Sequence, residues 1–245
     1  MNSISANLNI MIKAAEKASK ILIRDFGEVE KLQVSLKGPS DFVTNADKKV
    51  EKIIIEELSK SRKKYSIISE EAGEIVKSDT ENVWIIDPID GTTNFLHGVP
   101  HFAISIALKS KKEIVAGLIF DPIKNEMFYA EKNGGAYFNN QRIRVSKKKN
   151  LEECLFATGG KEFKINLNTR KSGSAALDMA YVAAGRFDGY FQNNLNIWDI
   201  AAGIILVEES GGKINQINYD NVSELKIIAS SNSIYEKMSE KLDNF

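Results

Sequence analysis

The densest group of side chains capable of chemistry lies in one nonapeptide, residues 87–95, with the sequence DPIDGTTNF. Its two carboxylates, Asp87 and Asp90, are three residues apart on a segment that we expect to bend at its proline. Gly91 allows close backbone approach, and residues 92–94 can open a helix whose free amide groups suit a phosphate. Because carboxylates repel a phosphate unless a cation lies between them, these hard oxygen ligands favour Mg²⁺. Taken alone, the nonapeptide is as compatible with a simple turn as with such a site.

Further carboxylates favour the metal interpretation because each one ends or opens a predicted element. Glu70 and Glu71 directly follow a predicted strand at 65–69. Asp199 and Asp47 each lie in the first turn of a predicted helix, where the helix dipole alone would explain a negative charge. One acidic site explains all of these positions better than separate coincidences do. The sequence therefore predicts a metal site assembled from distant segments.

Hydrophobic periodicity predicts the elements that must bring these residues together. The predicted helices are residues 8–26, 46–59, 174–184, 198–210 and 233–242. The predicted strands are residues 65–69, 83–86, 103–108, 114–120, 127–130, 136–138, 189–192 and 225–229. The strands between 103 and 145 indicate an antiparallel sheet, whereas the second half alternates helix and strand. A lysine-rich stretch at 146–150 marks the expected boundary between two subdomains.

Composition excludes several classes of protein. The 245 residues carry 33 basic and 33 acidic side chains, so the zero net charge argues against bulk binding to nucleic acid or an anionic membrane. No window reaches the roughly 18 apolar residues of a membrane span, and charges interrupt the N-terminal apolar stretch. Cys154 is the only cysteine, which excludes an internal disulfide and a cysteine-rich zinc site. We expect a cytoplasmic protein with no membrane or nucleic-acid partner.

Other catalytic motifs fail on spacing or context. His97 and His101 are four residues apart, but Gly98 and Pro100 oppose the helix that a zinc pair of this spacing requires. The Gly-Gly-Lys sequences lack the full spacing of a phosphate-binding loop, and no Gly-x-Gly-x-x-Gly motif occurs. Nucleotide kinases and dinucleotide-binding enzymes therefore have no motif support.

Two segments resemble the signatures of the inositol monophosphatase family, in the lithium-sensitive, magnesium-dependent phosphatase superfamily. The nonapeptide at 87–95 is similar to the first signature, and WDIAAG at 198–203 is similar to the second. Supporting segments in the family order are DFVTNAD at 41–47, SEE at 69–71 and GSAA at 173–176. The resemblance extends from residue 37 to residue 212. It implies an α+β fold, a layered α-β-α-β-α sandwich of the inositol monophosphatase and sugar phosphatase type.

The resemblance also implies one domain over residues 1–245 and a role for each site residue. The domain would comprise an α+β half, about 1–145, and an α/β half, about 146–245. The first Mg²⁺ would be held by Glu70, Asp87 and the Ile89 carbonyl, and the second by Asp87, Asp90 and Asp199. Gly91 and Thr92 would present backbone N–H groups to the phosphate. Thr92, hydrogen-bonded to Asp47, would orient the attacking water together with Glu70. The residues that would contact the inositol ring are Asp90, Ala176 and Gln192.

The implied function is hydrolysis of a small phosphorylated polyol or sugar, most typically inositol 1-phosphate, by a lithium-sensitive homodimer. The chain departs from the family at Gln192, where inositol-processing relatives usually carry a glutamate, and at Ser69, where glycine is common. The stretch 159–169 is also short. These departures leave open a fructose-1,6-bisphosphatase, a nucleotide 3′-phosphatase or an NADP phosphatase of the same superfamily. An alternative of another class is a binding or regulatory protein on this scaffold.

Overall fold

The computed structural model describes residues 4–28, 34–38, 41–160 and 167–242. The helices are α1 (Ala6–Phe26), α2 (Asn45–Ser61), α3 (Thr92–Leu96), α4 (Ala175–Ala183), α5 (Ile197–Glu209) and α6 (Tyr235–Lys241), with a 3-10 turn at Leu151–Glu153. A two-stranded hairpin pairs β1 (Val34–Gly38) with β2 (Asp41–Thr44).

Two larger sheets form the body of the molecule. The strands of the first are β3 (Tyr65–Ser69), β4 (Gly73–Ile75), β5 (Asp79–Asp90), β6 (Ala103–Ser110), β7 (Glu113–Asp121), β8 (Glu126–Glu131), β9 (Gly135–Phe138) and β10 (Gln141–Arg142), in the spatial order β10-β9-β8-β7-β6-β5-β3-β4. The strands of the second are β11 (Phe156–Thr158), β12 (Thr169–Arg170), β13 (Gly189–Leu195), β14 (Gly212–Ile214) and β15 (Leu225–Ser231), in the order β12-β11-β13-β15-β14.

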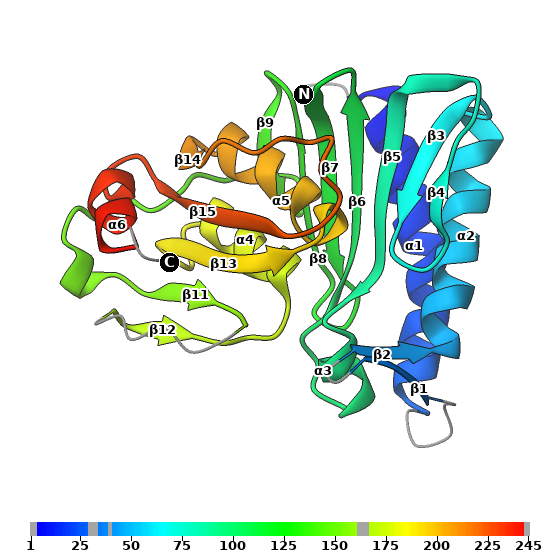
Figure 1. The fold of residues 1–245 in the computed structure, drawn as a ribbon, viewed down its shortest axis with the longest axis horizontal. Helices are drawn as coiled ribbons and strands as arrows, with labels where there is room; N and C mark the ends of the chain where they lie inside the picture. The colour runs from blue at the N-terminus through cyan, green and yellow to red at the C-terminus, as the bar shows by residue number, and fades with distance from the viewer. Residues whose placement is uncertain (1–3, 29–33, 39–40, 161–166, 243–245) are drawn as a thin grey trace.

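The sheets and helices alternate in five layers (Figure 1). Helices α1 and α2 cover one face of the eight-stranded sheet, and α4 and α5 lie between its other face and the five-stranded sheet. Helix α6 packs on the outer face of the second sheet, where Phe156, Phe191 and Ile228 are buried against it. This arrangement confirms the predicted α-β-α-β-α sandwich. The change from one sheet to the other falls near the lysine-rich stretch, whereas the single-domain organisation stays a prediction.

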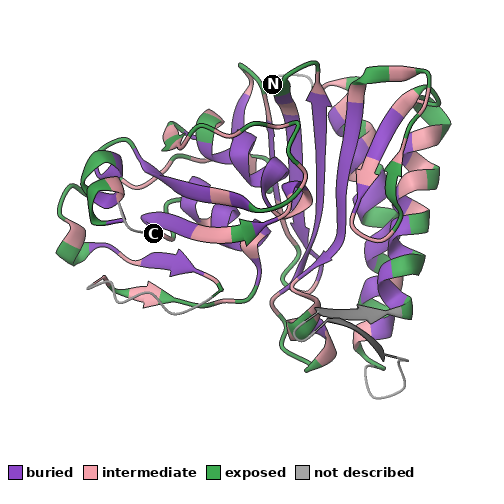
Figure 2. Cartoon of the chain, in the orientation of Figure 1, coloured by how far each residue is buried: buried purple, intermediate pink, exposed green. Residues whose placement is uncertain are grey.

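Apolar periodicity explains the placement of the helices. Along α2, one turn apart, Val50, Ile54 and Leu58 are fully buried against the first sheet, while lysines occupy the exposed side. Helix α5 is apolar nearly all round because it has sheet or helix on most sides, and Figure 2 shows it buried between the two sheets. None of the described helices has the length and apolarity needed to cross a membrane.

Strand β5 differs most from its prediction. We expected residues 83–86 followed by a bend at the proline, but the strand runs from Asp79 to Asp90 and carries both signature carboxylates. It pairs in parallel with β3 as far as Ile86 and antiparallel with β6 to its end. The register with β6 shifts between Asp87 and Asp90, around Pro88, because proline has no N–H for the ladder. The bend is therefore an irregularity within a strand, and β5 delivers both carboxylates at its C-terminal end.

Candidate active site

Five carboxylates from four separate segments gather at the C-terminal end of β5. Burial and four neighbouring carboxylates hold the pKa of the Asp87 carboxyl well above its usual range. In order of effect, these neighbours are Glu70, Asp90, Asp199 and Asp47. The structure thus brings together all the acidic residues that the sequence predicts for the site. Closely spaced carboxylates with a raised pKa are typical of functional sites.

Asp87 and Glu70 are adjacent because their strands are parallel neighbours. Ser69, the last residue of β3, lies opposite Ile86 of β5, and the Glu70 N–H donates to the Ile86 carbonyl at 3.2 Å. Asp87 is 2% exposed, and its Oδ1 accepts the Ile89 N–H at 3.0 Å. Two strand ends therefore place the two acidic side chains side by side at the edge of one sheet.

Asp90 links the first sheet to helix α4. It is 7% exposed, and it accepts hydrogen bonds from the Ser174 hydroxyl, the Ala175 N–H at 3.2 Å and the Ala176 N–H at 2.9 Å. Burial raises the pKa of Asp90 to about 6, although these donors act in the opposite direction. The carboxylate therefore satisfies the amide groups at the start of α4, a role that the sequence analysis did not foresee.

Asp199 reaches the site from the start of α5. It is the third residue of the helix, and its Oδ2 accepts the Asn196 N–H at 2.7 Å to form a capping box. The structural explanation that we considered for this residue is thus correct, and its proximity to Asp87 shows that it also faces the acidic site. One carboxylate combines both roles because a helix N-terminus points into the cluster.

Gly91 and Thr92 form the turn that follows Asp90. Gly91 adopts φ 94°, and a Cβ there would lie 3.1 Å from the His101 carbonyl and 3.2 Å from the Gly173 carbonyl. Only glycine fits this left-handed, crowded position. Thr92 opens α3, and its hydroxyl donates to the Ile89 carbonyl at 2.9 Å. That carbonyl keeps a second lone pair, so it still has the capacity to bind a cation. The hydrogen bond between Thr92 and Asp47 stays a prediction.

The family model for the inositol monophosphatase family matches residues 5–244. The chain belongs to the inositol monophosphatase family. It is 50% identical over 225 residues to inositol-1-monophosphatase of Rhizobium meliloti (strain 1021), covering 85% of this chain and 84% of the relative. It is 42% identical over 224 residues to Nus factor SuhB of Escherichia coli (strain K12), covering 85% and 84%. Extragenic suppressor protein suhB of Bartonella henselae superposes with a TM-score of 0.92 at 49% identity, covering 97% and 98%.

Membership makes the protein a phosphoric monoester hydrolase of a metal-dependent family. Among the described residues, no group of three acidic, histidine or cysteine side chains is already arranged to hold a metal ion. The donor set nevertheless fits a divalent cation, because it consists of hard oxygens whose repulsion such a cation would offset. Asp90 and Asp199 both accept protein N–H groups, so we expect a bound cation to turn some of these carboxylates toward itself.

Tyr190 is a site residue that the sequence analysis missed. It is fully buried in β13, and its hydroxyl donates to Gln192 Oε1 at 2.8 Å. Burial and the charges of Asp178, Asp90 and Asp199 raise the pKa of Tyr190 well above its usual range. This places Tyr190, and through it the amide of Gln192, beside the acidic cluster of the family fold. The alternation of a strand was the available signal, because residues two apart share a face.

Asn94 joins the signature turn to the loop before α4. Its Nδ2 donates to the His101 carbonyl and to the Ser172 carbonyl, both at 2.8 Å. The His101 carbonyl borders the crowded position of Gly91, and Ser172 directly precedes Gly173, whose carbonyl borders that position too. One amide group therefore joins the turn to the loop before α4. Asn94 is part of the nonapeptide at 87–95, but the sequence of the nonapeptide does not reveal that Asn94 bonds Ser172, 78 residues away.

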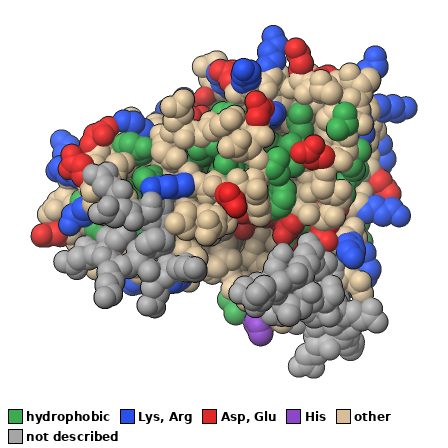
Figure 3. Space-filling view, in the orientation of Figure 1, with side chains coloured by type: hydrophobic (Ala, Val, Ile, Leu, Met, Phe, Trp, Pro, Cys, Tyr) green, Lys and Arg blue, Asp and Glu red, His purple; other side chains and the backbone are tan. Residues whose placement is uncertain are grey.

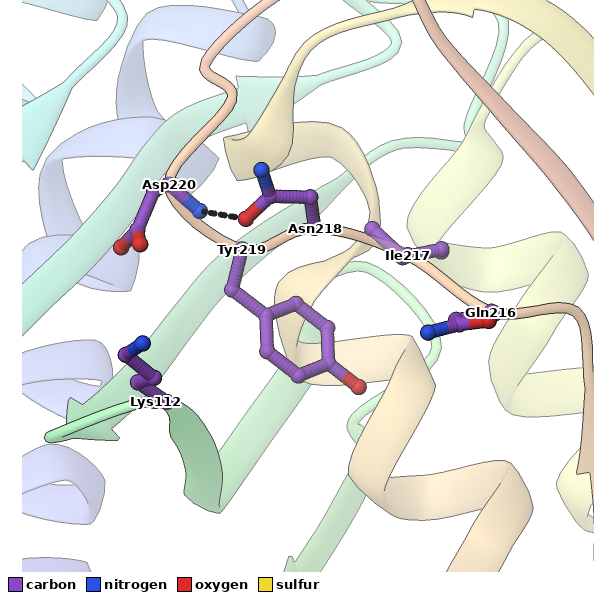
Figure 4. Close-up of a pocket in the computed structure, with 6 residues that line it drawn as sticks. All are labelled: Lys112, Gln216, Ile217, Asn218, Tyr219 and Asp220. Carbon is purple, nitrogen blue, oxygen red and sulfur yellow. Dashed lines mark hydrogen bonds between the residues drawn. The ribbon is translucent and has the colours of Figure 1, made fainter.

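A hollow of about 660 Å³ lies elsewhere, lined by Lys112, Gln216, Ile217, Asn218, Tyr219 and Asp220 (Figure 4). It adjoins the Ser110 end of β6, whereas the acidic cluster adjoins the Ala103 end. An eight-residue strand separates the two by about 24 Å, so the hollow is not part of the active site.

On the face shown in Figure 3, basic side chains are scattered among acidic ones rather than gathered in one patch.

Proposed function

We propose that the protein is a Mg²⁺-dependent phosphatase that hydrolyses inositol 1-phosphate or a closely related polyol or sugar phosphate. The observation that carries this proposal is the repulsion between Asp87 and four neighbouring carboxylates, next to a turn that allows close backbone approach. The name of the Rhizobium meliloti relative supports the substrate, and the all-oxygen donor set supports the metal. The proposed ligands are Glu70, Asp87, the Ile89 carbonyl, Asp90 and Asp199.

The residues of the chain would divide the reaction between them. Bound Mg²⁺ would offset the charge of the phosphate and lower the pKa of water, as divalent cations do in phosphoryl transfer. Glu70 and Thr92 would orient a water molecule for attack on phosphorus, with Glu70 accepting its proton. The N–H groups of Gly91 and Thr92 would bind the phosphate oxygens, and the alcohol would leave with a proton from solvent. Asp47 would fix the Thr92 hydroxyl.

The direct test measures inorganic phosphate release from inositol 1-phosphate, with and without Mg²⁺, for the parent protein and for Asp199→Asn. We expect release only with Mg²⁺ and a loss of several orders of magnitude in the variant, because removing a metal ligand removes transition-state stabilisation. Near-parental activity of a folded Asp199→Asn variant would contradict the metal assignment. Inhibition by Li⁺, which the family resemblance implies, is measured in the same assay.

Gln192 favours testing a second substrate class within the same chemistry. The Tyr190 hydroxyl engages Gln192 Oε1, which leaves the amide N–H groups to face other partners. A neutral donor there tolerates a second anionic group on the substrate, whereas a glutamate would repel it. A panel with inositol 1-phosphate, fructose 1,6-bisphosphate and a nucleotide 3′-phosphate distinguishes the classes. We expect Gln192→Glu to lower turnover of the bisphosphate relative to inositol 1-phosphate, and an unchanged ratio would exclude this role.

The alternative of another class is a binding or regulatory protein on this scaffold, and the Escherichia coli relative is named Nus factor SuhB rather than after a phosphatase activity. A non-catalytic protein would release no phosphate from any ester of the panel while remaining folded with Mg²⁺ present. The five retained carboxylates favour catalysis over that alternative. We also propose a homodimer, from the family resemblance, and a cytoplasmic location, which the single cysteine supports. Sedimentation velocity would measure the oligomeric state.

A further inference from the structure

A buried glutamate outside the proposed ligand set lies directly behind Glu70. Glu51 is on α2, one turn after Asp47, and it is 5% exposed. Its Oε1 accepts the Ser69 hydroxyl, the Glu71 N–H at 3.0 Å and the Ala72 N–H at 3.3 Å. The three donors lie immediately before and after Glu70. One oxygen of Glu51 therefore binds both flanks of the residue that would act as ligand and base.

Glu70 is also fixed from the other side. Its N–H donates to the Ile86 carbonyl of β5 at 3.2 Å, next to Asp87. The backbone of Glu70 is thus held between β5 and α2, and the turn after β3 has little freedom to move relative to either. Because Asp47 is on the same helix as Glu51, the hydrogen bonds of Glu51 also set the spacing between Asp47 and Glu70.

The burial of the Glu51 carboxylate is unusual, because its neighbours Val50 and Ile54 on α2 are fully buried apolar residues. Placing an acidic group near an acidic cluster is unfavourable unless strong hydrogen bonds compensate. Bonds to a charged acceptor are about twice as strong as neutral ones, so a carboxylate fixes three donors better than a neutral group would. The strength of these bonds is useful where a catalytic side chain must be held to within about half an ångström.

We propose that Glu51 is a positioning residue that holds the Glu70 carboxylate in the geometry for cation binding and for water activation. This inference rests on the proposed function, in which Glu70 is a ligand and a base. Glu51 itself would contact neither the cation nor the substrate. Removing it should therefore weaken cation binding and turnover while leaving the affinity for the substrate largely unchanged.

The experiment compares Glu51→Ala and Glu51→Gln with the parent, and Glu56→Ala, on the exposed side of the same helix, is the matched control. Titration calorimetry measures Mg²⁺ affinity, and amide hydrogen exchange reports on residues 71 and 72. For Glu51→Ala we expect Mg²⁺ affinity and kcat to fall by about 10- to 100-fold, the range typical of outer-shell residues. Exchange at the two amides should accelerate, and KM at saturating Mg²⁺ should change less than about twofold. Glu51→Gln retains an acceptor oxygen but not the charge, so it should recover only part of the loss.

Parental Mg²⁺ affinity and kcat in a folded Glu51→Ala protein with accelerated exchange would overturn the proposal. Should that variant fail to fold, Ser69→Ala removes one donor only, and its unchanged Mg²⁺ affinity would equally overturn it. The two hypotheses fail differently. A parent protein that binds Mg²⁺ but releases no phosphate contradicts the proposed reaction, while the affinity and exchange measurements still decide the role of Glu51.

Discussion

The two ends of strand β6 differ in how the charges of buried side chains are balanced. At the Ala103 end, Asp87 and Asp90 are buried among like charges, and the pKa of each is raised. At the Ser110 end, Lys109 is 8% exposed and pairs with Asp220 at 2.8 Å, and this hydrogen bond lowers the pKa of Asp220. At the second end, the charge of Lys109 is balanced by Asp220 of the same chain. At the first end, burial and neighbouring carboxylates raise the pKa of Asp87, and we propose that a divalent cation offsets this repulsion.

The strongest test of this contrast is Asp87→Asn. We expect turnover to fall by about 10²- to 10⁴-fold, because a cation ligand is worth several kcal/mol in the transition state. The free energy of unfolding without metal should rise by about 1 kcal/mol, since one of several repelling charges is removed. Phosphate release and urea denaturation measure the two effects. A variant that loses both activity and stability would show that Asp87 serves the fold.

The pH dependence of stability provides a second test. The pKa of Asp90 is about 6 in the folded protein against an ordinary value of 3.8, so the folded state binds more protons between these values. The free energy of unfolding without metal should therefore fall as pH rises from about 4 to about 6, and Asp87 extends this loss to higher pH.

Mg²⁺ favours the charged carboxylates, so its stabilising effect should grow over the same interval. Thermal unfolding with saturating Mg²⁺, compared with NaCl at matched ionic strength, measures this difference at about pH 5 and about pH 7.5. A Mg²⁺ effect that is equal at both pH values would contradict the cation site.

The smallest effect is expected at the opposite end of the strand. Lys109→Met keeps the aliphatic stem of the side chain and removes the ion pair with Asp220. The Asp220 side chain is largely exposed to water, so this pair contributes little to stability. We expect the unfolding midpoint to fall by about 2–4 °C, with turnover and Mg²⁺ affinity at parental values. Differential scanning fluorimetry and the phosphate assay measure both. A loss of activity comparable to that of Asp87→Asn would mean that the two ends do not differ as proposed.

Long elements with a clear period could be predicted from the sequence. The predicted helices 46–59 and 198–210 match α2 and α5 to within two residues at each end, and the predicted strand 65–69 matches β3. Three-residue strands such as β11 and β14 escaped prediction because they are too short to show alternation. Strand β5 was predicted too short because it starts with polar residues at 79–82 and contains a proline.

For the site, the carboxylates could be predicted but several of their partners could not. Each acid stands in a local motif or at the end of an element, whereas the contact between Ser174 and Asp90 joins residues 84 positions apart. Tyr190 shares a strand face with Gln192, which was a signal that the sequence offered. The contacts of Glu51 with residues 69, 71 and 72 depend instead on how α2 packs against the end of β3, and no spacing in the sequence encodes that packing. Sequence patterns therefore identified the charged groups, and the three-dimensional structure identified what holds them.

The most direct test of the acidic cluster is the position of a bound cation. Crystals grown with Mn²⁺, a stand-in for Mg²⁺ with measurable anomalous scattering, would locate it independently of activity. We predict at least one anomalous peak within ligand distance, about 2.0–2.3 Å, of carboxylate oxygens of Asp87 and Glu70. Ordered carboxylates with no peak among them at saturating Mn²⁺, or a peak only at the Lys109 end of β6, would contradict the account.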